Sequence, residues 1–145
     1  MIPLFGLVYV STATPLADLA QIEQLLDRAQ ERNARAGLTG VLLYDAGNFM
    51  QYVEGPADAL ARVYSSIRGS RLHSGVIEIL REPIRTREFP EWSMAFRSAA
   101  AFGMSHPAPR DDLLVPNGDA APGALSPART ILSKFWSRSG TAHAF

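Results

Sequence analysis

The sequence predicts an α+β fold, a ferredoxin-like βαββαββ mixed sheet with two helices on one face and a C-terminal helical extension. Short segments rich in β-branched and aromatic residues alternate with two segments whose apolar residues recur at helical spacing. The two connections that run from strand to strand through a helix must be right-handed, which favours both helices on the same face. A third helical pattern follows a segment rich in Ala, Pro, Gly and Ser.

The chain begins with a predicted strand and helix. The segment "LFGLVYVS" (4–11) is apolar on both sides, as in a strand that is covered on both faces or that has a ligand over one face. Thr14-Pro15 can cap and open a helix. This helix is expected to run to about Asn33, because Gly37 lies beyond its end.

A hairpin and a second helix are predicted next. The segments "TGVLLYD" (39–45) and "NFMQYVEG" (48–55) flank Ala46-Gly47, which is a hairpin signal. The segment "GPADALARVYSSIRGS" (55–70) then opens with Gly-Pro and has an amphipathic pattern. Its apolar residues at i, i+3, i+4 and i+7 are Leu60, Val63, Tyr64 and Ile67.

Two further strands complete the predicted sheet. They are "GVIEILREPI" (75–84) and the shorter "EWSMAFR" (91–97), separated by a charged segment that contains proline. Trp92 and Met94 alternate on the last strand, and ordinary packing would explain both residues.

The composition changes after this strand. Residues 98–128 are rich in Ala, Pro, Gly and Ser and are expected to form a linker. The segment "SPARTILSKFWSR" (126–138) begins with a Ser-Pro pair that is typical of a helix start. We therefore predict one domain over residues 1–97, and a linker with an amphipathic helix over residues 98–145. The helix should dock on the open face of the sheet or on a second subunit, through Ile131, Leu132, Phe135 and Trp136.

Composition excludes several classes of function. Fourteen basic and fourteen acidic residues leave no net charge, which argues against nucleic acid or an anionic membrane as a partner. The absence of cysteine excludes disulfides, thiolate catalysis and Cys-ligated metals. The apolar start has no basic segment and is too short to span a bilayer, so a cytoplasmic location is expected. A metal site is not expected from the scattered histidines His73, His106 and His143.

Gln51 is the residue that fits least well into a simple core. Because side chains alternate along a strand, Gln51 should point the same way as Phe49 and Val53, while Glu54 points the other way. Burying a primary amide without partners costs roughly 1–3 kcal/mol. Gln51 should therefore form hydrogen bonds with a neighbour or a ligand.

Several polar and aromatic residues fall together in the predicted fold. Taken alone, Tyr9 is explained as a core tyrosine and Asn33 as a helix cap. With Gln51 and the Trp-x-Met pair, however, they converge between the sheet and its two helices. This combination resembles the BLUF family, blue-light sensors that use FAD. The resemblance covers roughly residues 3–97, in the segments "LVYVS", "RNARAGLTGVLLYD", "FMQYVEG", "RLHSGVIEILREPI" and "FPEWSM".

The resemblance implies a flavin between the two helices and a photoactive pair of residues. Tyr9 would donate an electron and a proton to the light-excited flavin. Gln51 would bridge this tyrosine and the N5/O4 edge of the flavin, and its amide would reverse its hydrogen bonds when it switches. Trp92 and Met94 would pass the change outward.

The resemblance also implies residues that hold the cofactor. Asn33 would bind the pyrimidine end of the ring, and His73 would flank the ring. The family has an acidic residue and an arginine where this chain has Ser70 and Leu72, so Arg71 would substitute as a polar anchor. FAD is the expected cofactor, and FMN or riboflavin could also be accepted.

These observations predict a short photoreceptor without an enzymatic output domain. The segment that follows residue 97 is too short for a cyclase or a phosphodiesterase, so signalling is expected to occur through a partner protein or a homo-oligomer. One alternative is a small acylphosphatase-like hydrolase, which would need a phosphate-binding loop with Arg and Asn beside the first strand. Another is an RNA-binding sheet, which would need a basic face with exposed aromatic residues.

Overall fold

The computed structural model describes residues 3–98 and 126–142. In this part of the chain, a five-stranded sheet has the order β4-β1-β3-β2-β5. Neighbouring strands are antiparallel except β2 and β5, which are parallel. The α+β, ferredoxin-like prediction is therefore confirmed. The elements are β1 (Leu4–Ala13), α1 (Leu19–Ala36), β2 (Thr39–Asp45), β3 (Asn48–Pro56), α2 (Ala57–Arg68), β4 (His73–Ile84), β5 (Ala95–Ser98) and α4 (Pro127–Ala142).

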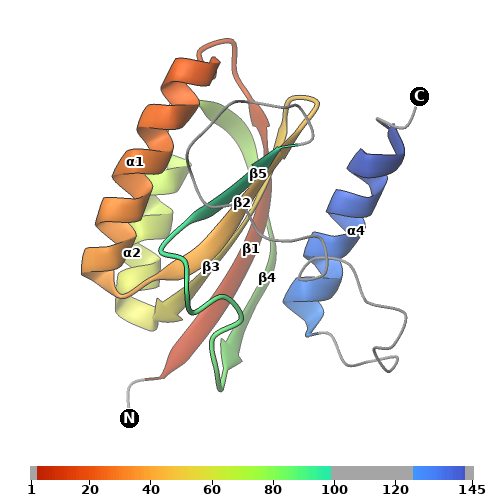
Figure 1. Cartoon of the computed structure of the whole chain (residues 1–145). Helices are drawn as coiled ribbons and strands as arrows, with labels where there is room; N and C mark the ends of the chain where they lie inside the picture. Colours follow the sequence, from red (N-terminus) through yellow and green to blue (C-terminus); the bar gives the residue numbers. More distant parts are fainter. Residues whose placement is uncertain (1–2, 99–125, 143–145) are drawn as a thin grey trace.

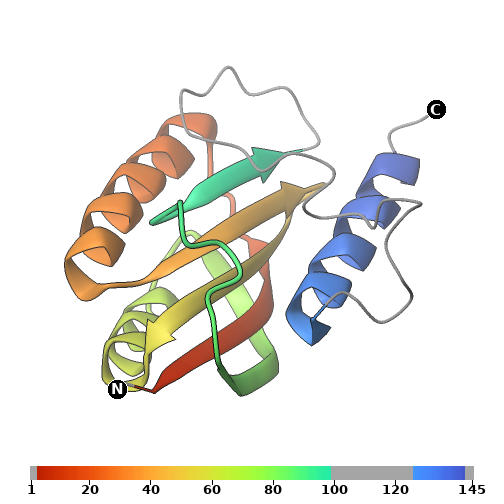
Figure 2. The same ribbon diagram turned by 60° about the horizontal axis from the view of Figure 1, so that its bottom comes forward.

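The sheet separates two apolar layers. Helices α1 and α2 cover one face, and helix α4 lies against the other (Figure 1). The turned view shows the same arrangement (Figure 2). Because side chains alternate along each strand, every central strand contributes to both layers. The layer under α1 and α2 includes Leu7, Tyr9, Leu42, Phe49 and Val53, and the layer under α4 includes Val8, Val41, Leu43, Met50 and Tyr52.

The β2–β3 hairpin forms where the sequence predicts it. Ala46 and Gly47 both have positive φ angles, 49° and 84°. Two successive residues with positive φ are typical of the type I′ turn, which matches the twist of the strands that it joins. The hairpin sets the register that places Gln51 opposite Leu42 on β2, and the antiparallel pairing of β3 with β1 places Gln51 opposite Tyr9.

Helix α1 begins later than predicted. Thr14-Pro15 does not open it, because the N-cap is Asp18, whose carboxylate accepts a hydrogen bond from the backbone N–H of Gln21 at 2.8 Å. The hydroxyl of Thr14 instead donates to the carbonyl oxygen of Arg71 at 2.7 Å. At the other end, Gly37 adopts the left-handed conformation that was expected of a residue beyond the helix.

Strand β5 also begins later than predicted, and this changes the placement of two residues. Trp92 and Met94 precede the strand rather than alternate along it. Met94 packs in the layer under α1 and α2, whereas Trp92 packs with the layer under α4. The backbone turns before the strand, where the N–H of Trp92 donates to the carbonyl oxygen of Phe89 at 3.3 Å. The strand alternation that was predicted for the pair is therefore wrong.

Helix α4 docks on the open face of the sheet. Leu132 is fully buried and Ala128 almost fully, while Ile131 and Phe135 are partly buried at the edge of the same layer. The linker and the side chain of Trp136 lie outside the described residues. Within the part that the structure describes, none of the helices is long and apolar enough to cross a membrane.

Candidate functional site

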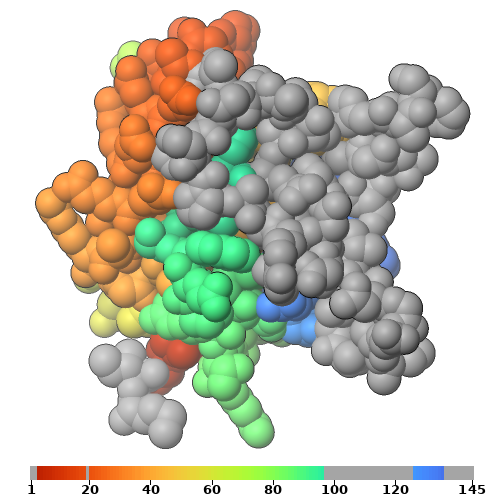
Figure 3. Space-filling model, viewed as in Figure 1, coloured from red at the N-terminus to blue at the C-terminus, as the bar shows by residue number. Residues whose placement is uncertain are grey.

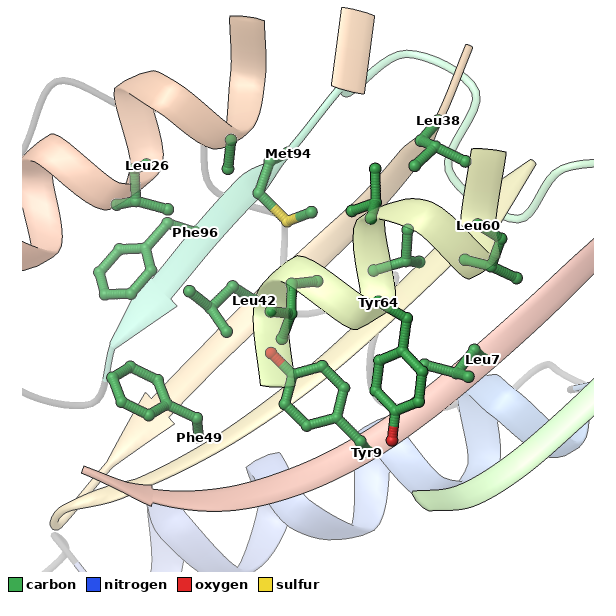
Figure 4. Packing of buried hydrophobic residues seen from close by; sticks show 14 of the residues in the cluster. Leu7, Tyr9, Leu26, Leu38, Leu42, Phe49, Leu60, Tyr64, Met94 and Phe96 are labelled. Atoms are coloured by element: carbon green, nitrogen blue, oxygen red, sulfur yellow. The ribbon is translucent and has the colours of Figure 1, made fainter. Parts of the chain in front are cut away.

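A pocket opens between the sheet and the two helices α1 and α2. Its volume is about 540 Å³ when the space at its mouth is counted. Figure 4 shows the Tyr9 hydroxyl and the Met94 sulfur pointing into this layer, close to Leu42 and Phe49. The polar side chains that line the pocket are Tyr9, Arg32, Gln51, Ser66, Ser70 and His73.

Tyr9 and Gln51 form the polar centre of the pocket. They lie directly opposite each other on β1 and β3. The Tyr9 hydroxyl donates a hydrogen bond to Gln51 Oε1, and the two residues are only 3% and 4% exposed. Burial raises the pKa of the Tyr9 phenol far above its ordinary value, and Tyr64 raises it further, whereas Arg32 lowers it. The phenol is therefore protonated at neutral pH and can donate this hydrogen bond.

This hydrogen bond also fixes the orientation of the Gln51 amide. Because Oε1 faces Tyr9, Nε2 faces the other way, where it donates to the Met94 sulfur at 3.5 Å. A thioether is a weak acceptor, and a primary amide has two N–H groups to satisfy. In the described residues, no stronger acceptor is bonded to Nε2. A buried donor is thus available at the wall of the pocket for a ligand.

His73 is fixed at the pocket wall by both of its ring nitrogens. Nε2 lies 2.6 Å from the carbonyl oxygen of Ile67, and Nδ1 lies 2.7 Å from Ser11 Oγ. Since a carbonyl can only accept, Nε2 must carry a hydrogen, and Nδ1 of the neutral ring then accepts from the Ser11 hydroxyl. The ring stands edge-on to Tyr9 with centroids 5.9 Å apart. His73 therefore offers the pocket its ring rather than a free nitrogen.

A comparison with protein families decides what kind of pocket this is. Residues 4–95 match the model of the BLUF family, described as sensors of blue-light using FAD. The chain belongs to the BLUF family. The prediction of a flavin-binding blue-light sensor is confirmed at this level, and the hydrolase alternative finds no support.

Individual BLUF relatives agree with the family match. The beta subunit of photoactivated adenylate cyclase from Euglena longa is 37% identical over 89 residues, which are 61% of this chain and 10% of that protein. The blue light- and temperature-regulated antirepressor BluF of Escherichia coli is 28% identical over 88 residues, which are 61% of this chain and 22% of that protein. The chain thus spans about a tenth of the length of the cyclase subunit that it matches.

Solved structures of BLUF proteins share the fold. The dark-state structure of BlrB superposes with a TM-score of 0.65 at 38% identity, over 68% of this chain and 74% of that chain. The structure of Klebsiella pneumoniae BlrP1 with FMN and cyclic diGMP superposes with a TM-score of 0.62 at 30% identity, over 66% of this chain and 26% of that chain.

The residues of the pocket fit the flavin that BLUF domains bind. A flavin ring is flat and largely apolar, and it has polar atoms along one edge. The pocket offers apolar walls and, at one place, the unsatisfied N–H of Gln51, which matches an acceptor on such an edge. The apolar walls are formed by Leu25, Leu26, Ala29, Leu42 and Ile67.

Not every predicted site residue lies in the pocket. Asn33 is fully buried, but its amide donates to the carbonyl oxygen of Ser93 at 2.8 Å and its Oδ1 accepts from Arg32 Nε at 3.3 Å. Arg71 is exposed, and neither it nor Trp92 lines the pocket. The roles of Asn33, Arg71 and Trp92 toward a flavin stay predictions.

Arg32 and Ser66 line the pocket and were missed by the sequence analysis. Arg32 precedes Asn33 on α1, and burial lowers the pKa of its guanidinium. Ser66 lies on the last turn of α2 and also lines the pocket. Each of the two lies within one helical turn of a residue that faces the sheet. This closeness in the sequence was the available sign that they could reach the pocket. Ser70, which was noted only as a departure from the family pattern, is also at the pocket.

Proposed function

We propose that this chain is a blue-light photoreceptor that binds a flavin in the pocket between α1, α2 and the sheet, and that signals through a hydrogen-bond switch of Tyr9, Gln51 and the flavin. The single observation that carries this proposal is the state of Gln51. Its amide is buried, its oxygen is occupied by Tyr9, and its nitrogen has only a sulfur acceptor in the described residues.

Tyr9 is suited to donate an electron and a proton to the excited cofactor. A bound flavin supplies a chromophore that becomes a strong oxidant on absorbing blue light. Burial keeps the phenol of Tyr9 protonated at rest, so electron and proton remain together until light is absorbed. Its proton lies on the hydrogen bond to Gln51 Oε1, which makes the amide the natural relay for proton movement.

The Gln51 side chain can retain a reversed hydrogen-bond pattern because its amide oxygen and nitrogen are nearly equal in size. Turning the amide over exchanges its donor and its acceptor without moving other heavy atoms. Oε1 would then face the Met94 sulfur, and this sulfur would lose the N–H that it now accepts. The switch at Gln51 is therefore felt at Met94, directly before β5.

The cofactor and the output complete the proposal. FAD is the proposed ligand, with FMN or riboflavin as acceptable replacements, and Arg32, Ser66 and Ser70 are available to its polar tail. Residues 1–97 form the photosensor and residues 98–145 the output extension, which signals by binding a partner protein or further copies of this chain. Relatives join the same kind of domain to a cyclase, whereas here we propose output by binding. The cytoplasmic location stays a prediction.

Absorption spectroscopy of the purified chain tests the proposal. After supplementation with flavin, the protein should be yellow, and blue light should shift the flavin absorption to longer wavelength. Tyr9→Phe should retain the flavin and lose this shift, because the ring stays while the hydroxyl is removed. Tyr64→Phe is the matched control, since Tyr64 lies 5.8 Å from the Tyr9 ring and does not line the pocket.

The outcomes separate the parts of the proposal. A chain that stays colourless after supplementation would count against flavin binding. A full light-induced shift in Tyr9→Phe would show that flavin is bound but that Tyr9 is not the donor. Loss of the shift in Tyr64→Phe as well would indicate a general disturbance of the core rather than a specific role for Tyr9.

A further inference from the structure

The face of the sheet opposite the pocket contains a fully buried carboxylate, that of Glu54 on β3. Its two oxygens accept four hydrogen bonds, so the carboxylate is saturated. Two of these bonds fix the backbone of the segment between β4 and β5, and two come from side chains of the sheet. The donors are the backbone N–H of Glu88 at 2.6 Å and of Phe89 at 2.8 Å, the hydroxyl of Thr39 at 2.8 Å and the hydroxyl of Tyr52 at 2.9 Å.

Helix α4 contacts Glu88 and Phe89 as well, through Arg129. Arg129 Nε donates to the Glu88 carboxylate at 2.6 Å, and Arg129 Nη2 donates to the Glu88 carbonyl oxygen at 2.8 Å. The guanidinium also lies over the Phe89 ring, 4.9 Å from its centroid. The ion pair is largely shielded, since the two side chains are only 22% and 20% exposed. A bidentate, shielded arginine is a stronger contact than an exposed ion pair.

The segment held in this way leads directly back to the pocket. Phe89 stacks on Trp92, and the carbonyl oxygen of Trp92 accepts from the backbone N–H of Gly40. Two residues later, Met94 contacts Gln51. The stretch between β4 and β5, in green in Figure 3, lies at the surface between helix α1 in orange and the start of helix α4 in blue. Residues 88–94 thus connect the contact between Met94 and Gln51 to the Arg129 contact of α4. Ring stacking and hydrogen bonds hold this segment along its length.

The Arg129 contact lies at the same end of helix α4 as the most buried apolar residues of the helix. In the described part of the helix, Ala128 and Leu132 are its buried apolar residues, and both lie in its first two turns. The arginine contact is in the same turns. Loss of the Arg129 contact would leave this end of the helix held by Ala128, Leu132 and the partly buried Ile131 and Phe135, and would weaken its attachment to the sheet.

We propose that Arg129 is a positioning residue that keeps α4 on the sheet in the dark, and that the switch at Gln51 loosens this contact through residues 88–94. The inference rests on the proposed function. Reversal of the Gln51 amide disturbs Met94, and the movement passes along the chain to Phe89 and Glu88. The hydrogen bonds of Arg129 to Glu88 and its contact with the Phe89 ring then weaken. The undocked helix then uncovers the apolar layer of Val8, Val41, Leu43, Met50 and Tyr52.

Hydrogen exchange of the full chain with bound flavin tests this inference. Peptides from residues 127–142 are compared in the dark and under blue light. In the wild type, light should lower their protection by about tenfold or more, as expected for opening of a locally docked element. Arg129→Gln should lower the protection to a similar extent in the dark, and light should then add little. Arg129→Lys keeps the charge without the two-point geometry and should lie between.

The matched control is Arg35→Gln. It removes the ion pair with Glu31, which has the same N–O distance of 2.6 Å but is exposed on α1. It should leave exchange in residues 127–142 unchanged in the dark and in light. Each variant must show the dark flavin spectrum of the wild type, which excludes misfolding, and if Arg129→Gln fails this check, Arg129→Lys and the wild type decide.

The inference is overturned if Arg129→Gln, or Arg129→Lys in its place, keeps the protection of the wild type in the dark. It is also overturned if the wild type shows its light-induced spectral shift while exchange in α4 does not change. Either of these results leaves the proposed photochemistry intact. Absence of the spectral shift in the wild type would instead refute the proposed function itself.

Discussion

Gln51 and Glu54 lie three residues apart on β3 and are both almost completely buried, yet their polar atoms have different surroundings. Because the spacing is odd, they point to opposite faces of the sheet. The Glu54 carboxylate accepts four hydrogen bonds from the protein. The Gln51 amide has one strong bond, from Tyr9, and one weak one, to the Met94 sulfur.

The difference distinguishes a structural polar group from a functional one. Folding a carboxylate into an apolar layer is tolerable only when its oxygens are satisfied, and Glu54 uses this requirement to hold residues 88 and 89 in place. A buried amide whose hydrogen bonds to the protein are incomplete is tolerable where a ligand supplies the missing hydrogen bond. Gln51 is such a residue, and it lies on the face that carries the pocket.

The largest effect expected from this contrast is on stability at Glu54. Glu54→Leu should lower the free energy of unfolding by about 3–5 kcal/mol, because several buried donors lose their acceptor at about 1–3 kcal/mol each. Urea denaturation of the flavin-free chain measures it. The control is Glu91→Leu, which removes an exposed carboxylate near the same segment and should change stability by less than about 0.5 kcal/mol.

A small effect at Glu54 would break the comparison. If Glu54→Leu is as stable as Glu91→Leu, the four hydrogen bonds contribute nothing net, and saturation of a buried carboxylate would not identify a structural group in this protein.

The sequence predicts the frame of the pocket but not what surrounds it. Periodicity locates the helices and central strands, and alternation on β3 correctly places Gln51 and Glu54 on opposite faces. These are local properties, since each depends on neighbours within one or two turns or pairs. The same reasoning singles out Gln51 as a buried amide that needs a partner.

The errors arise where distant segments decide the outcome. Strand β5 begins late because the turn from Phe89 to Trp92 comes first, and that turn depends on Glu54, far away in the sequence. The buried amide of Asn33 bonds to Ser93, 60 residues later. The ion pair of Arg129 with Glu88 spans 41 residues. No local pattern encodes such contacts, so the roles of Glu54 and Arg129 could not be predicted from the sequence.

An intermediate effect is expected at alkaline pH, where the two faces can be compared through their tyrosines. Burial raises the pKa of Tyr9 and of Tyr52 far above 10.0, and the Glu54 carboxylate raises that of Tyr52 further. A pKa that is higher in the folded state gives stability that is present below the unfolded pKa and is lost as pH rises above it. Unfolding free energy should therefore fall above about pH 10, by at most about 1.4 kcal/mol per pH unit for each buried phenol.

Urea denaturation at several pH values, with Tyr9→Phe and Tyr52→Phe, assigns the two contributions. Each variant should remove its own share of the slope above about pH 10. If the wild-type slope is unchanged in both variants, these phenols ionise in the folded state as they do in water, and the burial of the Tyr9–Gln51 pair is less complete than the structure has it.

The smallest effect on stability is expected at Gln51, although its effect on function is complete. Gln51→Leu leaves one buried donor, the Tyr9 hydroxyl, without its acceptor, but it also removes the poorly satisfied buried N–H of Gln51. The two changes partly offset each other, so the free energy of unfolding of the flavin-free chain should fall by about 1–2 kcal/mol, less than the loss at Glu54. The apolar side chain is of similar size, so flavin should still bind. The light-induced spectral shift should be absent, because no amide remains to reverse its hydrogen bonds. Glu54→Leu, which introduces the same side chain on the same strand, is the comparison for the stability measurement. A loss of stability at Gln51 as large as at Glu54 would make Gln51 a structural residue, and a normal spectral shift in Gln51→Leu would remove it from the switch.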